Sequence, residues 1–125
     1  YYGLDLLFLC NKYSLIEVGT EKLDGQVSPE LKSLLVMENS KGVTNLVLDM
    51  SGARYCDSSG LSAVLVGNRL CNGVQGSFIL CGVQDPVMKM ITISQLDSIL
   101  SITPTAQEAE DYLFMNEIEK DLGNE

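Results

Sequence analysis

From residue 43 onward, short apolar runs alternate with longer amphipathic stretches, and this alternation limits the possible folds more than any other feature. The runs 43–50, 77–81 and 98–102 have the length of buried strands, and a helix-like segment follows each of them. Strands that alternate with helices in this way pair in parallel through right-handed crossovers. We therefore expect an α/β domain of βαβ units, with helices packed against the sheet.

The N-terminal segment predicts a different local arrangement. Two short apolar runs, 4–10 and 13–18, are separated by Asn11-Lys12, a spacing typical of a β-hairpin. The strands of a hairpin are antiparallel. We therefore expect a mixed β-sheet, in which an N-terminal antiparallel hairpin joins the parallel strands.

The first helix has a clear start signal in the segment that begins at residue 28. Ser28 is expected to be its N-cap, with Pro29 at the first helical position. Leu31, Leu34 and Leu35 are spaced to form one apolar face of this helix.

Two further helices are marked by their ends. One is expected to begin at Ser58 and to end at Asn72-Gly73, because glycine suits the left-handed cap of a helix. A shorter helix is expected to begin at Asp85-Pro86 and to run to about residue 90.

The last helix carries much of the negative charge. Thr105 and Glu108 form a capping-box pattern at its start, and we expect it to run to about residue 122. Seven acidic residues and one lysine lie between residues 107 and 125, so this segment holds most of the net charge of −9. The apolar stripe of the helix includes Ala109, Tyr112, Leu113 and Leu122.

Length and charge narrow the possible classes of protein. The 125 residues suffice for one core, and we expect a single domain over residues 1–125 with its core at about 6–115. A net charge of −9 opposes binding to nucleic acid or to an acidic membrane surface, because both need basic patches. No run approaches the ~20 apolar residues of a membrane span, and the opening segment lacks the basic region of a signal peptide. We expect neither nucleic acid nor membrane as a partner.

The four cysteines give no sign of a metal site or of disulfide bonds. Cys10, Cys56, Cys71 and Cys81 form no CxxC pair, and the chain contains no histidine. Each lies in an apolar run, where a reduced thiol packs as a small hydrophobic group. We therefore expect four free thiols in a reducing cytoplasm, with no metal and no cofactor.

The stretch YCDSSGLSAVLVGNRL, residues 55–70, places Asp57 and Ser58 between a strand and a helix. Side chains in such connections form sites in α/β proteins, but Asp or Ser can equally cap the helix. A serine nucleophile is excluded because no histidine can act as its base, and no SxxK or GxSxG motif is present. A P-loop is excluded because the segment CDSSGL has one glycine and no lysine, and Asp57 would repel a bound nucleotide phosphate.

These residues resemble the signature of STAS domains, a family named after sulfate transporters and anti-sigma factor antagonists. The family pattern is Asp-Ser-Ser-Gly-Leu between a strand and a helix, matched here from Asp57 to Leu61. Upstream, EKLD resembles the Leu-Asp at a strand end of the family and places Asp24 in that position. The order of strands and helices agrees along about 110 residues, whereas the first ten residues and the long acidic helix depart from it. The resemblance implies a single STAS-like domain.

The resemblance also implies a function, which is that of a bacterial anti-sigma factor antagonist rather than an enzyme. Ser58 would be phosphorylated by an anti-sigma factor with serine kinase activity, and a serine phosphatase would reverse the modification. The unphosphorylated form would bind that partner and release a sigma factor.

The partner-binding residues would be Asp24, Asp57, Ser58, Ser59 and Gly60, with Ser59 and Gly60 allowing a tight turn and close backbone approach. Asp24 is equally well explained as a strand-end turn residue. Two other functions stay open: a STAS-like module that binds a nucleotide or lipid, and a structural subunit of a signalling assembly.

Overall fold

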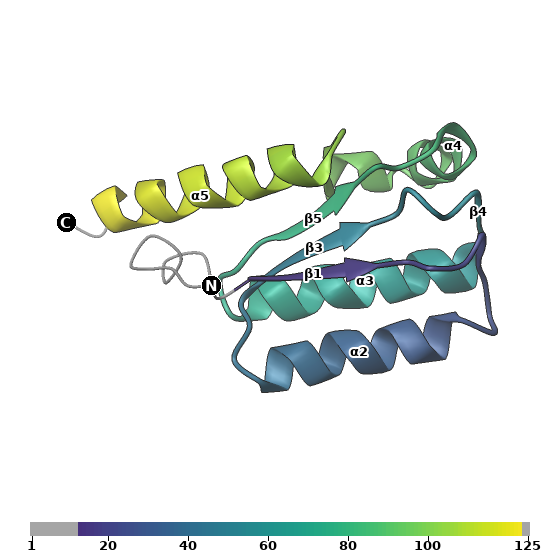
Figure 1. Cartoon of the computed structure of the whole chain (residues 1–125), viewed down its shortest axis with the longest axis horizontal. Coiled ribbons are helices and arrows are strands. Elements are labelled where there is room, and N and C mark those ends of the chain that lie inside the picture. Colours follow the sequence, from purple (N-terminus) through teal and green to yellow (C-terminus); the bar gives the residue numbers. More distant parts are fainter. Residues whose placement is uncertain (1–12, 124–125) are drawn as a thin grey trace.

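The computed structural model describes residues 13–123 of the chain, and its centre is a four-stranded parallel sheet. The strands lie in the order β1-β3-β5-β6, and Figure 1 shows β1, β3 and β5 running side by side. Leu15 of β1 is paired in register with Val47 of β3, which is paired with Ile79 of β5. The bounds of these strands are β1 Tyr13–Glu17, β3 Asn45–Asp49, β5 Phe78–Cys81 and β6 Ser101–Thr103. The alternation of strands and helices after residue 43 therefore predicted the parallel sheet correctly.

A second, smaller parallel sheet is formed by two very short strands. β2 (Lys22–Leu23) pairs with β4 (Tyr55–Cys56), so that Leu23 is in register with Cys56. Both strands lie in connections that follow strands of the main sheet. Their pairing brings residues 24 and 57, which directly follow them, to the same edge of the fold.

The predicted antiparallel hairpin is not supported. Its second half corresponds to β1, but β1 pairs in parallel with β3, and every strand pair among residues 13–123 is parallel. The first half, residues 4–10, lies outside the described residues. Short apolar runs separated by two residues satisfy the hairpin pattern, yet the partner of a strand is decided by tertiary packing. The prediction of a mixed sheet was wrong for this part of the chain.

The four α-helices of the described chain cover the main sheet on both faces. Figure 1 shows α2 and α3 side by side on one face, with α5 along the other. Successive strand residues point to opposite faces, so Leu46 and Leu48 pack in the α2–α3 layer, whereas Val47 packs with the α5 layer. The helices are α2 (Ser28–Ser40), α3 (Ser58–Gly73), α4 (Asp85–Ile93) and α5 (Ala106–Gly123), with a short 3₁₀ helix, η1 (Leu96–Ser98), between α4 and β6.

The start of α2 differs from the prediction. Its N-cap is Val27, and Ser28 is already helical, buried, and donates its hydroxyl to the Asp24 carbonyl oxygen at 2.6 Å. Pro29 lies in the first turn as expected. A serine hydroxyl can donate as well as accept, and here the carbonyl oxygen of the preceding turn is within its reach.

Three further expectations need correction. Leu34 of α2 is exposed, unlike Leu31 and Leu35, so only two of the three leucines form the buried face. The left-handed residue after α3 is Gln75 (φ 61°) rather than Gly73. The last strand was expected at residues 98–102, but Ser98 is the last residue of the 3₁₀ helix η1, and the strand β6 begins at Ser101.

The C-terminal helix begins as its sequence predicted. The Glu108 backbone N–H donates to Thr105 Oγ1 at 3.2 Å, which is half of the predicted capping box. Ala109 and Leu113 are buried against the sheet, whereas Tyr112 is exposed. The side chain of Leu122 lies outside the described part.

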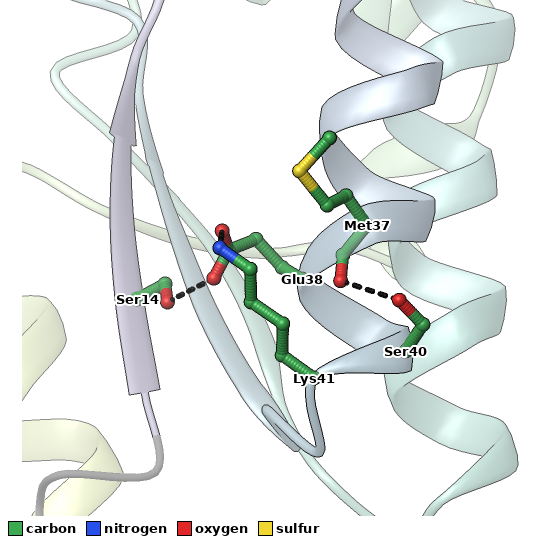
Figure 2. A network of polar contacts seen from close by, with 5 residues as sticks. All are labelled: Ser14, Met37, Glu38, Ser40 and Lys41. Atoms are coloured by element: carbon green, nitrogen blue, oxygen red, sulfur yellow. Dashed lines mark hydrogen bonds and ion pairs between the residues drawn. The ribbon is translucent and has the colours of Figure 1, made fainter.

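Polar contacts hold strand β1 between the two helical layers. On one side, Ser14 Oγ donates to Glu38 Oε1 of α2 at 2.6 Å, and Lys41 forms an ion pair with Glu38 at 3.4 Å (Figure 2). The Ser14 hydrogen bond is the main reason why the pKa of Glu38 lies below its ordinary value. On the other side, the Tyr13 hydroxyl donates to the Glu110 carboxylate of α5.

The described chain carries neither a candidate membrane span nor a candidate metal cluster. No helix within residues 13–123 combines the length and apolar character needed to cross a bilayer. Among the same residues, no group of three or more Cys, Asp or Glu side chains is arranged to hold a metal ion. Cys56, Cys71 and Cys81 are buried free thiols, and Cys10 lies outside the described residues.

Candidate functional site

Asp57 is the residue that caps helix α3. Its side-chain Oδ1 accepts the Gly60 backbone N–H at 3.0 Å, and its carbonyl oxygen accepts the Leu61 N–H at 3.0 Å. Its own N–H is held by the Leu23 carbonyl oxygen at 3.3 Å. The choice between Asp and Ser as the cap, which the sequence left open, therefore falls on Asp57.

Ser58 is the first helical residue of α3, and its side chain is exposed. Within the described part of the chain, its hydroxyl takes part in no hydrogen bond. Ser59 differs because it is half-buried and lies against the neighbouring turn, with its Oγ 3.7 Å from the place where a Cβ on Gly25 would be. Of the two adjacent serines, Ser58 is the more accessible to another protein.

Gly60 allows α3 to begin in direct contact with strand β2. A Cβ at this position would lie 2.7 Å from Cys56 Sγ and still closer to the Leu23 carbonyl oxygen. Because that carbonyl belongs to the backbone, it cannot move away as a flexible side chain would. The close backbone approach expected at Gly60 is therefore present.

Asp24 organises the turn between β2 and α2. Its carboxylate Oδ1 accepts the Gln26 N–H at 3.1 Å, and its carbonyl oxygen accepts the N–H groups of Val27 (3.1 Å) and Ser28 (2.8 Å). This geometry is that of an Asx-turn, which explains Asp24 as a structural residue. The pairing of β2 with β4 nevertheless brings this turn beside the start of α3.

A hollow lies between this turn, α2 and α3, and its charged lining residue was not identified from the sequence. The three serines of the α3 start line it together with three residues of α2. Among its described lining residues are Ser28, Pro29, Lys32, Ser58, Ser59 and Ser62. Lys32 lies one helical turn after Ser28, a spacing that places both on one helix face. No local motif links Lys32 to residue 58, because α2 and α3 come together only in the folded chain.

A second hollow on α2 adjoins the first through Lys32. It is lined by Lys32, Ser33, Val36 and Met37, and the last two side chains are about half exposed. Exposed apolar groups that lie together are typical of surfaces that contact other proteins. The sequence did not predict this feature either. Val36 and Met37 directly follow Leu34 and Leu35, so the sequence does not distinguish exposed from buried apolar residues in this run.

The chemistry of these residues suits recognition better than catalysis. The first hollow offers serine hydroxyls and one ammonium group, and its described lining residues include neither a histidine nor a carboxylate that could act as the base for a serine. Burial, followed by the charge of Asp57, raises the pKa of the nearby Cys56 thiol to about 11. That thiol is therefore protonated and unreactive at neutral pH.

The comparisons with known proteins agree with this geometry. The family model described as the STAS domain matches residues 16–109. The chain belongs to the STAS domain family. This STAS domain is 33% identical over 81 residues to BtrV of Bordetella bronchiseptica, a protein named as an anti-sigma factor antagonist, and the match covers 65% of this chain and 67% of BtrV.

Solved structures show the same fold. A protein from Thermotoga maritima, named as an anti-sigma factor antagonist, matches this STAS domain with a TM-score of 0.73 at 22% identity, over 79% of this chain and 86% of that chain. The Bacillus cell fate determinant SpoIIAA in its phosphorylated form matches with a TM-score of 0.64 at 22% identity, over 81% and 90% of the two chains. The sequence resemblance to the STAS family is confirmed, and this domain is related to anti-sigma factor antagonists.

Proposed function

We propose that this STAS domain is an anti-sigma factor antagonist that is switched by phosphorylation of Ser58. The unphosphorylated domain binds an anti-sigma factor with serine kinase activity, and a sigma factor is released. The kinase transfers the γ-phosphoryl group of ATP to Ser58 Oγ, so an O–P bond forms, ADP leaves and the hydroxyl proton is released. A serine phosphatase hydrolyses the phosphoserine and restores binding. The domain itself is a regulator rather than an enzyme.

The observation that carries this proposal is the division of roles between Asp57 and Ser58. Asp57 caps α3 through its own carboxylate, so the helix does not need the Ser58 hydroxyl. Ser58 is exposed and can be modified without loss of the cap. The named relatives, and the existence of a phosphorylated form of SpoIIAA, support the same reading.

The energies of such a switch favour a change in binding over a change in folding. A phosphate adds about −1.5 to −2 charges, and the N-terminus of a helix favours a negative charge by ~0.3–1 kcal/mol. At an interface that already contains Asp57, the same charge costs several kcal/mol through repulsion and desolvation. Each ~1.4 kcal/mol changes an affinity tenfold. Phosphorylation therefore weakens partner binding while the domain stays folded.

The partner surface is proposed to centre on Asp24, Asp57, Ser58, Ser59 and Gly60. The carboxylate of Asp57 lies beside the acceptor, and Gly60 brings the β2 backbone close to it. The exposed apolar side chains of Val36 and Met37 extend this surface along α2. We place the interaction in the cytoplasm, where the buried thiols stay reduced and sigma factors act.

The direct test is a pull-down with the unmodified domain from its source cell, followed by identification of the retained protein. The retained protein is then incubated with the domain and ATP, and the modified residue is mapped by peptide sequencing. We expect phosphate on Ser58, none in Ser58→Ala, and normal modification of the control Ser59→Ala. Phosphate found mainly on Ser59 would overturn the assignment. Thermal stabilisation by a nucleotide or a lipid, with no protein retained, would favour the ligand-binding alternative.

A further inference from the structure

Lys32 of α2 lies beside the proposed phosphoacceptor although it is 26 positions away in sequence. Figure 1 shows α2 and α3 running side by side, and Lys32 lines the same hollow as Ser58, Ser59 and Ser62. Among the described residues that line this hollow, Lys32 is the charged one. The hollow thus brings one ammonium group to the surface on which Ser58 is exposed.

The ammonium group of Lys32 is not committed to a carboxylate. In the part of the chain that the structure describes, the ion pair that forms is Lys41–Glu38, and Lys32 makes neither an ion pair nor a hydrogen bond. The Asp57 carboxylate accepts the Gly60 N–H and the Asp24 carboxylate accepts the Gln26 N–H, and neither of them forms an ion pair with Lys32. Lys32 is therefore available for a new anion in the hollow.

We propose that Lys32 pairs with the phosphoryl group of phosphorylated Ser58 and holds it in the hollow between α2 and α3. This inference rests on the proposed function, since it assigns a residue to the phosphorylated state. A lysine ammonium is a compact charge on a flexible stem, which suits a phosphate whose position is set by another residue. Lys32 acts as a positioning residue and takes no part in the transfer of the phosphoryl group.

The pairing adds to the effect of the helix N-terminus in letting the folded domain tolerate the negative charge of the phosphate next to Asp57. Lys32 offsets the repulsion between the phosphate and the Asp57 carboxylate, which lie on adjacent residues at the start of α3. The phosphate then fills the hollow beside the partner surface. Within the folded domain the contact reduces repulsion, while the phosphate held in the hollow still obstructs the surface that the unmodified domain presents to its partner.

The test uses the full 125-residue chain with phosphoserine inserted at position 58 during synthesis, so that no kinase is required. The second ionisation of the phosphate, with an ordinary pKa of about 6, is followed by ³¹P NMR titration. The charged groups on the elements that meet at the hollow include Lys32 of α2, Asp57 at the N-cap of α3 and Asp24 in the neighbouring turn. A nearby ammonium group stabilises the dianion, so Lys32→Gln is expected to raise the pKa of the phosphoserine by about half a pH unit.

Two matched variants make the result specific. Lys41→Gln removes the same charge from the far end of the same helix and should leave the pKa of the phosphoserine unchanged. Lys32→Arg keeps the charge and should keep the parent value. Equal titration curves for Lys32→Gln and the parent, or equal shifts for Lys32→Gln and Lys41→Gln, would overturn the pairing. If the retained kinase never modifies Ser58, the proposed function fails, whereas the titration still decides whether Lys32 pairs with a phosphate at this position.

Discussion

Asp57 and Ser58 are adjacent in the sequence but have opposite relations to helix α3. The Asp57 side chain turns back to the Gly60 N–H, whereas the Ser58 side chain faces outward. Gly60 completes this arrangement because its lack of a Cβ lets the helix begin against the β2 backbone. Each of these roles has its own measurable consequence.

Loss of the Asp57 cap should weaken the fold by a modest amount. Asp57→Ala leaves the Gly60 N–H without its acceptor, so we expect the free energy of unfolding to fall by ~1 kcal/mol. Asp57→Asn keeps a side-chain acceptor and should stay close to the parent. Urea denaturation of the three proteins measures both values. Equal stability of Asp57→Ala and the parent would mean that Asp57 is not the cap.

A methyl group at Gly60 should be far more damaging than one at the other end of the same helix. In Gly60→Ala the new Cβ meets the Leu23 carbonyl oxygen and Cys56 Sγ, and we expect a loss of about 2–3 kcal/mol. The matched control is Gly73→Ala, because nothing lies within 4 Å of a Cβ there. Thermal unfolding should show a lower Tm for Gly60→Ala alone. Similar melting of both variants would contradict the close approach of α3 to β2.

At the scale of the elements, local signals predicted what depends on neighbouring residues. Thr105 with Glu108 marks a true helix start because the two capping groups lie within one turn of each other. Asp85-Pro86 marks another, because both proline and an acidic side chain are favoured in the first turn of a helix. The partner of β1 could not be predicted, because strand pairing depends on residues about 30 positions away. β2 and β4 have two residues each, which is too short for any periodic pattern.

The same distinction applies to the candidate site. The motif identified Asp57, Ser58 and Gly60 because they are contiguous, and it led to Asp24 through a family resemblance. Lys32 was missed because only the packing of α2 on α3 brings it to Ser58. A contact between two elements cannot be predicted from the local sequence unless the spacing between the contacting residues is itself a known motif.

The contact between β1 and α2 predicts a pH effect. The Ser14 hydroxyl stabilises the charged form of Glu38 and lowers its pKa in the folded state (Figure 2). The contribution of Glu38 to the free energy of unfolding is fully present above the pKa that Glu38 has in the unfolded chain. It is lost as the pH falls through the lower pKa that Glu38 has in the folded domain. We expect Ser14→Ala to raise the pKa of Glu38, as measured by NMR of its side-chain carboxyl carbon.

Ser40→Ala is the control for this titration. The Ser40 hydroxyl donates to the Met37 carbonyl oxygen on the same turn of α2. Removing it should leave the pKa of Glu38 at the parent value. An unchanged pKa in Ser14→Ala would contradict the hydrogen bond between β1 and α2.

At the scale of the whole molecule, the parallel sheet separates two apolar layers, and buried thiols lie in both. Cys56 and Cys71 pack in the layer of α2 and α3, whereas Cys81 packs in the layer of α5. Burial is the main cause that raises the pKa of each thiol from 9.0 to about 11. The raised pKa of each thiol thus depends on the burial that the two apolar layers provide.

These thiols predict a loss of stability in alkaline solution. The pKa values of the thiols are higher in the folded than in the unfolded state. Their contribution to the free energy of unfolding is therefore fully present below about pH 9, the ordinary pKa of a thiol, and is lost as the pH rises towards about 11, the pKa in the folded domain. Urea denaturation in reducing buffer across this range should show a falling free energy of unfolding. Cys71→Ala removes one titrating group and should make the decline shallower. A decline as steep as that of the parent would contradict a buried neutral thiol at this position.

The affinity of the anti-sigma factor for the domain before and after phosphorylation of Ser58 tests the central claim most directly. The partner retained in the pull-down is titrated with the parent, with the phosphoserine-58 protein and with Ser58→Asp, and the Tm of each is measured in the same buffer. The account predicts at least a tenfold loss of affinity for the phosphoserine protein, equivalent to ~1.4 kcal/mol, and a partial loss for Ser58→Asp. Both should keep a Tm within about 4 °C of the parent, because a negative charge is tolerated at the start of α3. Equal affinities would contradict the switch, and a loss of affinity with a collapsed Tm would show that phosphorylation acts by unfolding the domain.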